Sequence, residues 1–396
     1  METTQRAVKE RTRNTAVGQR PRTFIQHRTS GALLRVAAFL SLSICPALVS
    51  CSFARAETVG SADGRDIKKI AIGDGIYQFM TMRDSYVRQL NSIVIVNEND
   101  VLVFDTDTRP SSARIILAEI RKITDKPVRY VVNSHWHPDH WSGNEVYAQA
   151  FPGLEIIATE RTREFMQNVA DAWPMRFSAE LKRRQSALGQ EISTGKVEDG
   201  TALTAGQRRQ DEDDLRNYES FVNEAASLRR IYPTLVYVDK LTLYHGGREF
   251  RFMSVTGDAE GTTVLYLPKE KLLITGDAIS YPIPYVTPPP SRQAKSLRAL
   301  AQLDVDVIIP GHGPAFHDKN FLNLEVELLE SVIEGVHDAL LRGMLTLDEV
   351  QKAVTVEQLR EKFTHNDKDL DTRFRERVKY LVKMAVREAR DGQDYQ

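Results

Sequence analysis

The chain has 396 residues, of which 41% are hydrophobic and 27% are charged. This length and composition are sufficient for a buried core and indicate one large domain, or a domain with an appendage. The 53 basic and 54 acidic residues give a net charge of −1, whereas a nucleic-acid-binding surface normally shows a clustered basic excess. No nucleic-acid partner is therefore expected.

The first 56 residues have the pattern of a targeting leader. A basic segment precedes Val36–Val49, a run that is almost free of polar side chains but too short for a membrane-spanning helix. Ala54-Arg55-Ala56 follows as an A-x-A cleavage pattern, which predicts a signal peptide and a mature chain that starts near Glu57. Two alternatives remain: lipidation of Cys51, which makes the protein a lipoprotein tethered to the membrane, and an uncleaved anchor. We expect a periplasmic or secreted protein, or a membrane-anchored lipoprotein.

Both cysteines, Cys45 and Cys51, lie in this leader. The body of the protein therefore has no internal disulfide, and cysteine cannot serve there as a metal ligand or nucleophile.

The segment that follows alternates between strand and helix patterns. Ser92–Val96 and Val101–Phe104 are short β-branched and apolar runs that predict a hairpin. Ser111–Ile123 has apolar residues at helical spacing, and strands are predicted at Val128–Val132 and Leu154–Ala158. This alternation predicts a layered α/β domain.

A change of composition at residues 160–230 predicts a polar helical insert, within which Asp211–Asp214 is expected at a helix start or in a loop. Six strands and a helix are predicted between Leu235 and Ile309, and helices are predicted from Phe321 to the end. Two capping-box patterns occur in this tail, Thr346 with Glu349 and Thr355 with Gln358. The predicted divisions are a leader at 1–56, a domain at 57–318 that contains the insert, and a helical extension at 319–396.

The strongest chemical signal is a cluster of histidines directly after the Val128–Val132 strand. It reads Asn133-Ser134-His135-Trp136-His137-Pro138-Asp139-His140, so three imidazoles and a carboxylate lie within six residues. Neutral imidazole and carboxylate groups suit zinc or a similar divalent metal. Chance assembly of this spacing is improbable, because the whole chain has nine histidines.

This motif resembles the signature of the metallo-β-lactamase superfamily, and three later or earlier segments extend the resemblance. They are Phe104-Asp105-Thr106, Thr275-Gly276-Asp277 and Ile309-Pro310-Gly311-His312-Gly313, and all stand in the expected order. The resemblance covers roughly residues 70–318 and is closest to the glyoxalase-II-like and lactamase-like metal-dependent hydrolases. It implies an αββα sandwich, here with a helical insert and a helical C-terminal extension.

The resemblance also implies a ligand set for two divalent metal ions, with zinc expected and manganese or iron as alternatives. His135 and His137 would hold the first metal, Asp139, His140 and His312 the second, and Asp277 would bridge them. Asp105 is expected to accept a hydrogen bond that orients the histidine loop.

One position departs from the family pattern. Where the family usually has a further histidine, this chain has Asp258, in Thr256-Gly257-Asp258-Ala259-Glu260. Three interpretations follow: Asp258 binds the first metal, Glu260 binds it instead, or neither does and the first site is weak or empty. A carboxylate here adds negative charge and favours a harder metal.

These features predict a hydrolase that uses a metal-activated water on an ester, thioester, lactone or amide bond of a small-molecule substrate. Asp139 is the expected catalytic residue, placed to accept a proton or orient the nucleophile. The alternatives are a di-iron or other redox metalloprotein and a catalytically degenerate metal-binding protein. In the insert, Phe165, Trp173, Phe177 and Tyr218 either line a lid over the site or pack the helices of the insert, and Tyr285 either touches substrate or packs.

Overall fold

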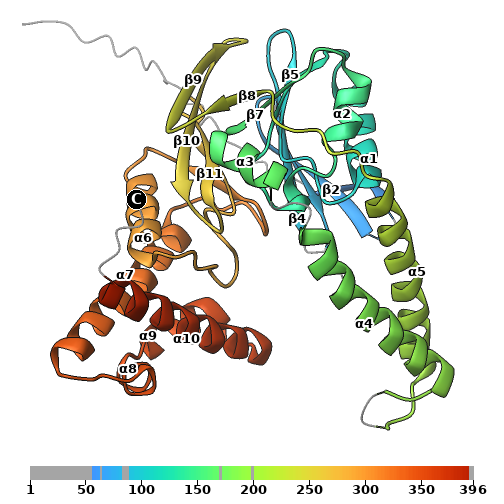
Figure 1. Cartoon of the computed structure of the whole chain (residues 1–396). Helices are drawn as coiled ribbons and strands as arrows, with labels where there is room; N and C mark the ends of the chain where they lie inside the picture. The colour runs from blue at the N-terminus through green and yellow to red at the C-terminus, as the bar shows by residue number, and fades with distance from the viewer. Residues whose placement is uncertain (1–55, 63–64, 83–88, 169–171, 198–199, 392–396) are drawn as a thin grey trace, which may run out of the picture. The chain divides into compact units, whose positions relative to one another are not determined.

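The computed structural model describes residues 56–62, 65–82, 89–168, 172–197 and 200–391 (Figure 1). The predicted leader, with Cys45 and Cys51, therefore lies outside the described residues except for Ala56. None of the helices in the described ranges combines the length and the apolar composition that a membrane span needs.

The first sheet has eight strands, which lie side by side in the order of the chain. Neighbouring strands are antiparallel from β1 to β5 and parallel from β5 to β8. The strands are β1 (Glu57–Ala62), β2 (Arg65–Gly73), β3 (Ile76–Thr81), β4 (Leu90–Val96), β5 (Val101–Phe104), β6 (Val128–Val132), β7 (Glu155–Thr159) and β8 (Leu235–Tyr237). Parallel neighbours place their carboxyl ends at the same edge of a sheet, so the segments after β5 and β6 lie together.

The second sheet has five strands in the order β13-β12-β11-β10-β9. Only β12 and β13 are parallel, so their carboxyl ends also share one edge. The strands are β9 (Lys240–His245), β10 (Arg248–Thr256), β11 (Glu260–Leu267), β12 (Leu272–Gly276) and β13 (Val307–Pro310).

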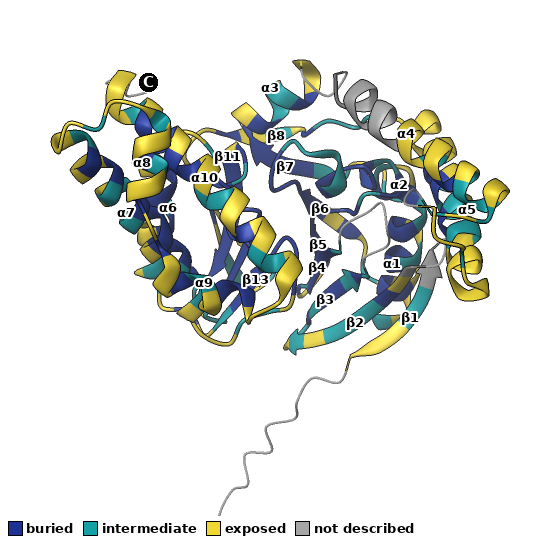
Figure 2. Ribbon diagram, turned by 90° about the horizontal axis from the view of Figure 1, so that it is seen from below, coloured by how far each residue is buried: buried dark blue, intermediate teal, exposed yellow. Residues whose placement is uncertain are grey.

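The two sheets pack face to face, and helices cover their outer faces. Side chains alternate along a strand: in β5, Leu102 and Phe104 join the core between the sheets, whereas Val101 and Val103 pack against α1 (Pro110–Ile123) and α2 (Asn144–Ala150). On the outer face of the second sheet, α6 (Pro290–Ala301) and α7 (Asn320–Leu341) bury a third cluster. Figure 2 shows the strands mainly in dark blue between helices with exposed outer faces. The predicted αββα sandwich is confirmed.

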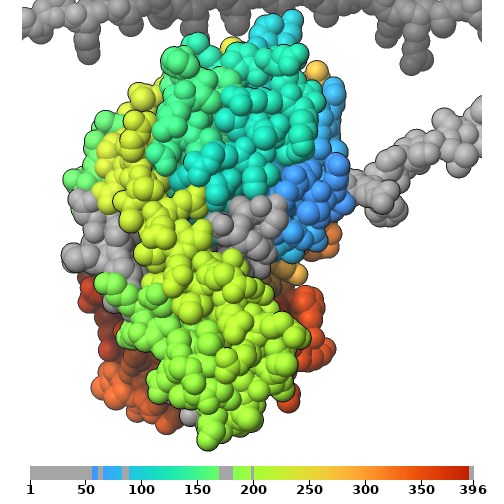
Figure 3. All heavy atoms as spheres, turned by 90° about the vertical axis from the view of Figure 1, so that its right-hand side faces the viewer, coloured from blue at the N-terminus to red at the C-terminus, as the bar shows by residue number. Residues whose placement is uncertain are grey.

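The polar segment 160–230 is helical, as predicted, and forms α3 (Glu160–Asn168), α4 (Ala172–Thr194) and α5 (Ala205–Ser227). Figure 3 faces this insert, with α5 in yellow-green. The expectation that Asp211–Asp214 starts a helix or forms a loop is wrong, because this run lies inside α5. The helix begins earlier because Thr204 and Gln207 form a capping box there.

Glu224 of α5 docks the insert onto the start of α1. Its carboxylate accepts hydrogen bonds from the backbone N–H of Ser111 at 2.6 Å and from the Ser111 hydroxyl at 2.9 Å. It therefore satisfies an N–H group at the start of α1 that has no partner within the helix. We expect Glu224→Ala to lower the free energy of unfolding by about 1 kcal/mol, since loss of a cap has that effect. Urea denaturation measures this, with Glu219→Ala on the same helix as the control; equal midpoints for the two variants would contradict it.

The C-terminal helices are α7, α8 (Leu347–Ala353), α9 (Glu357–Thr364) and α10 (Lys368–Asp391). The apolar face of the last helix packs into the same cluster as α6, with Phe374, Leu381 and Ala385 buried. The Thr346–Glu349 capping box is confirmed. The one predicted at Thr355 is wrong, because α9 begins after Val356, which makes no side-chain cap.

Candidate metal centre

The residues of the histidine motif meet those of the later segments at one edge of the sandwich. His135 and His137 follow β6, and Asp139 and His140 lie on a single 3₁₀ turn at Pro138–His140. Asp277 follows β12 and His312 follows β13, whereas Asp105 follows β5. Because β5 and β6 are parallel, as are β12 and β13, each sheet brings two chain segments to the same edge.

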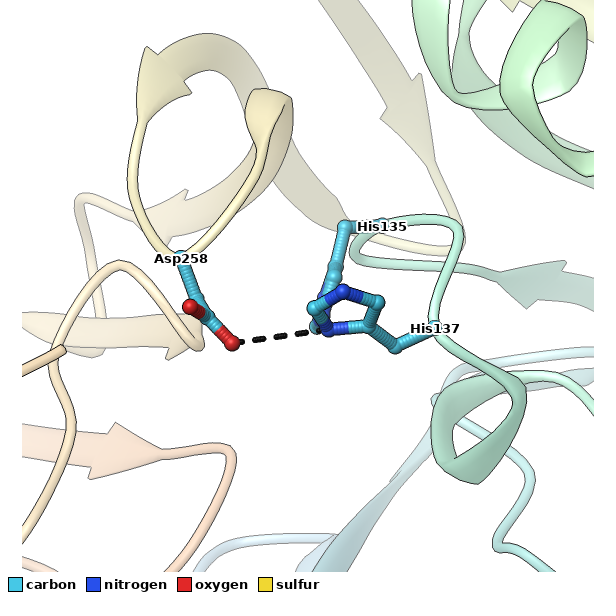
Figure 4. A group of neighbouring side chains, drawn as sticks. All are labelled: His135, His137 and Asp258. Carbon is cyan, nitrogen blue, oxygen red and sulfur yellow. Dashed lines mark hydrogen bonds and ion pairs between the residues drawn. The ribbon is translucent and has the colours of Figure 1, made fainter. Parts of the chain in front are cut away.

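The first group of side chains that could hold a metal ion consists of His135, His137 and Asp258. The Nε2 atom of His135 lies 2.7 Å from Nδ1 of His137, and that Nδ1 atom lies 3.4 Å from Oδ2 of Asp258. Figure 4 shows the Asp258 carboxylate, from the β10–β11 loop, facing the two imidazoles. The carboxylate at the departing position therefore lies within reach of the same point as the two histidines.

Two further groups share members with one another, namely Asp139–His140–His312 and His135–His140–Asp277. Oδ2 of Asp277 lies 3.2 Å from Nε2 of His312 and 3.5 Å from Nε2 of His140. Oδ2 of Asp139 lies 3.3 Å and 3.4 Å from the same two nitrogens. Asp277 also shares a group with His135, so its group joins the other two, and its role as a bridging ligand stays a prediction.

Buried polar atoms without hydrogen-bond partners test whether these residues fit a metal. Within the described residues, Nε2 of His140, Nε2 of His312 and Oδ1 of Asp277 are all buried and make no hydrogen bond. Such groups are costly to leave unpaired, and imidazole nitrogen with carboxylate oxygen is the ligand set that divalent zinc takes. The residues therefore fit a divalent metal.

The carboxylates and imidazoles of this site shift one another's pKa. Burial opposes ionisation of Asp277, but the charges of His312 and His140 outweigh it and hold the pKa of this carboxyl well below its usual range. Asp139 behaves alike, since His140 overcomes burial and lowers its pKa. Burial lowers the pKa of His312, but Asp277 and Asp139 raise it to about 10. Protons on imidazoles thus balance the carboxylates without a metal, and metal binding would release them.

Asp105 is completely buried behind the histidines. Its Oδ1 atom accepts a hydrogen bond from the backbone N–H of Ser134, and its Oδ2 atom accepts one from Nδ1 of His140, both at 2.7 Å. Burial raises the pKa of Asp105, although the charge of His140 counters it. These contacts fix the ring orientation of His140, which is what an orienting residue was expected to do.

Glu260 points elsewhere. Its side chain is half-exposed and pairs with Arg161 at 3.2 Å and Arg292 at 3.6 Å. His245 also lies outside the site, where it pairs with Asp100.

The aromatic residues that the sequence offered for a lid or a substrate contact differ in where they lie. Phe165 stacks on Trp136, whereas Tyr218 is buried in α5, and the side chains of Trp173 and Phe177 lie outside those described. Tyr285 lies under the guanidinium of Arg377, at 4.7 Å from ring centre to Cζ, a packing contact with α10.

Gly311 approaches Asp277 so closely that only a residue without Cβ fits. The motifs do not reveal these contacts, because they depend on segments far apart in sequence.

Comparison with known proteins finds alkylsulfatases among the similar sequences and folds. A linear primary-alkylsulfatase from Pseudomonas sp. (strain ATCC 19151) is 27% identical over 270 residues, which cover 64% of this chain and 48% of the relative. The solved structure of the stereoselective inverting sec-alkylsulfatase Pisa1 from Pseudomonas sp. matches with a TM-score of 0.52 and 17% identity, over 81% of this chain and 50% of that one. A double mutant of the sec-alkyl sulfatase PisA1 gives a TM-score of 0.54 at 17% identity, with the same coverage. The chain thus spans about half the length of these alkylsulfatases.

The family model described as "Metallo-beta-lactamase superfamily" matches residues 85–312. That segment is more than half of the chain and includes the histidine motif, Asp277 and His312. The chain therefore belongs to the metallo-beta-lactamase superfamily.

Proposed function

We propose that the chain is a metal-dependent hydrolase that cleaves a sulfate ester of a small organic alcohol. The observation that supports a metal-dependent hydrolase is the set of three overlapping ligand groups, in each of which the ligand atoms lie within 4.8 Å of one another. The sulfate ester is supported by the relative described as a linear primary-alkylsulfatase. The proposal covers the reaction in which a sulfate monoester and water give an alcohol and hydrogen sulfate.

In this proposal, His135, His137 and Asp258 hold one metal. Asp139, His140 and His312 hold the other, and Asp277 lies between them. Asp258 is favoured over Glu260, which pairs with two arginines away from the histidines. Divalent ions such as zinc, when bound, act as Lewis acids that activate water and polarise the ester.

The protein side chains supply orientation and proton handling. Asp139 is the most exposed of these carboxylates, with 25% of its side chain accessible, whereas Asp277 is 3% accessible. Because Asp139 is the most accessible of these carboxylates, it is the one best placed to accept the proton that the attacking water loses. Asp105 holds Nδ1 of His140 protonated and leaves Nε2 free to face the metal.

Metal removal is the first test. We expect a chelator to abolish hydrolysis of alkyl sulfates by the purified chain, because the ligand groups contain no other source of Lewis-acid catalysis, and we expect added zinc, manganese or iron to restore it. Metal content and turnover are measured together on a panel of alkyl sulfates, lactams, lactones, thioesters and phosphodiesters.

The panel separates the alternatives. Turnover of a lactone or thioester without any sulfate ester would overturn the substrate and leave the hydrolase standing. About two irons per chain with no turnover would favour a di-iron redox protein. Metal-loaded protein that hydrolyses nothing, but gains activity in Asp258→His, would identify a degenerate metal-binding protein.

A further inference from the structure

His137 and Asp258 are the partly exposed ligands of the first group, and surrounding side chains therefore hold them less firmly than they hold His135. His135 is fully buried, whereas the side chains of His137 and Asp258 are 19% and 18% exposed. They come from different sheets of the sandwich, His137 after β6 and Asp258 between β10 and β11. Helix α3 contacts the neighbours of both.

On the His137 side, the contact is a series of rings. The Trp136 ring lies 4.4 Å from the His137 ring, at an interplanar angle of 65°, and Phe165 of α3 stacks on Trp136 at 5.6 Å. The backbone carbonyl of Trp136 also accepts a hydrogen bond from the Trp141 indole at 2.8 Å. Movement of His137 would therefore disturb a stacked pair that α3 completes.

On the Asp258 side, the end of β7 and the start of α3 contact the first residues of β11, directly after the loop that carries Asp258. Arg161 donates from Nε and Nη2 to one oxygen of Glu260, at 3.3 Å and 3.2 Å. The hydroxyls of Thr159 and Thr162 donate to the carbonyl of Gly261, at 2.6 Å and 3.2 Å. Gly261 has a φ of +77°, and a Cβ there would lie 2.8 Å from Cβ of Arg161. The helix thus rests directly on the strand that follows Asp258.

One residue links the two sides, because the Arg161 guanidinium also lies 4.4 Å over the Phe165 ring. Contacts therefore run in a closed ring from His137 through Trp136, Phe165, Arg161 and Glu260 to the Asp258 loop, and Asp258 lies 3.4 Å from His137. We propose that Arg161 and Phe165 are positioning residues that hold His137 and Asp258 in register and so set the metal affinity of the first group. The inference rests on the proposed metal centre.

The Phe165–Trp136 contact and the Arg161–Glu260 contact must be removed together. The Arg161–Glu260 pair is about half-exposed on both sides, and a pair so exposed stabilises little by itself. Arg292 also lies 3.6 Å from Glu260, so Glu260 stays paired when Arg161 is replaced. The double variant Arg161→Gln with Phe165→Ala removes the stacked ring and the Arg161 contact to Glu260, and it leaves the hydrogen bonds of Thr159 and Thr162 to Gly261 in place. The single variant Phe165→Tyr keeps an aromatic ring on Trp136. Arg163→Gln is a matched control on the same helix.

The readout is calorimetric titration of the metal-free full chain with zinc, with Asp258→Ala as the reference that identifies the first group. We expect the double variant to weaken that binding event by about tenfold and to leave the other unchanged, because residues that orient ligands have effects of this size. Phe165→Tyr and Arg163→Gln should bind like the unmodified chain.

The inference would be overturned if the double variant bound zinc in both events as tightly as the unmodified chain. It would also be overturned if Arg163→Gln weakened the first event as much as the double variant does. A double variant that binds zinc normally but has a raised KM would assign Phe165 and Arg161 to substrate contact and would also overturn it. Failure of the proposed function is distinguishable, because the unmodified chain would then bind zinc in two events without hydrolysing a sulfate ester.

Discussion

Replacing Asp277 by asparagine is expected to remove most hydrolytic activity and to lower metal affinity by about 10²-fold or more, since even orienting residues reach that range. The two side chains have nearly the same shape, but the amide is neutral and a weaker ligand. Asp277 belongs to the group with His135 and His140 and lies 3.2 Å from Nε2 of His312. Its loss therefore affects both halves of the centre.

The substitution also has a readout that does not depend on turnover. In the metal-free protein Asp277 is the main charge that raises the pKa of His312, so Asp277→Asn should move that pKa downward from about 10. Metal content by mass spectrometry and titration of the histidines by NMR measure the two effects. Asp304→Asn, on an exposed side chain paired with Lys271, is the control. Unchanged metal content in Asp277→Asn would contradict the bridging position.

The fold could be predicted from the sequence because the apolar pattern of each strand shows which of its faces are buried. Val101–Phe104 has no polar residue, as expected of a strand buried on both faces, and it lies between α1 and the second sheet. The prediction of a helix start or loop at Asp211–Asp214 was wrong because acidic residues are typical of a helix start, whereas the capping box at Thr204 sets the start of α5. Local composition competes there with a stronger cap seven residues earlier.

The seven expected metal-site residues lie together because they stand in loops that follow strands at one edge of the sandwich. The place of Asp258 could not be settled from spacing alone, since Asp258 and Glu260 are two residues apart. In the structure Glu260 turns to Arg161, a partner almost one hundred residues away in sequence. The contacts of Phe165 with Trp136 likewise depend on how α3 packs, which no local pattern encodes.

Gly311 offers the second large effect. A Cβ atom at this position would lie 2.1 Å from Oδ1 of Asp277, 3.0 Å from the carbonyl carbon of Gly276 and 3.2 Å from Cε1 of His140. The loop cannot retreat freely, because the N–H of Gly311 donates to the carbonyl of Gly276 at 2.8 Å and its carbonyl accepts from the N–H of Asn91 at 2.9 Å. Gly311→Ala must therefore displace Asp277 or break these backbone hydrogen bonds.

Either outcome separates Asp277 from His312, the residue next to Gly311, so we expect Gly311→Ala to lose tight metal binding. The displaced backbone should also lower the free energy of unfolding by about 1–3 kcal/mol, the usual effect of overpacking. Zinc titration and urea denaturation measure these changes. Gly189→Ala is the matched control, because a Cβ there meets no atom within 4 Å and alanine favours its helix. A Gly311→Ala variant that binds two metals as tightly as Gly189→Ala would show that the Asp277 carboxylate can move aside, and that its place between the two histidine sets is not a condition for metal binding.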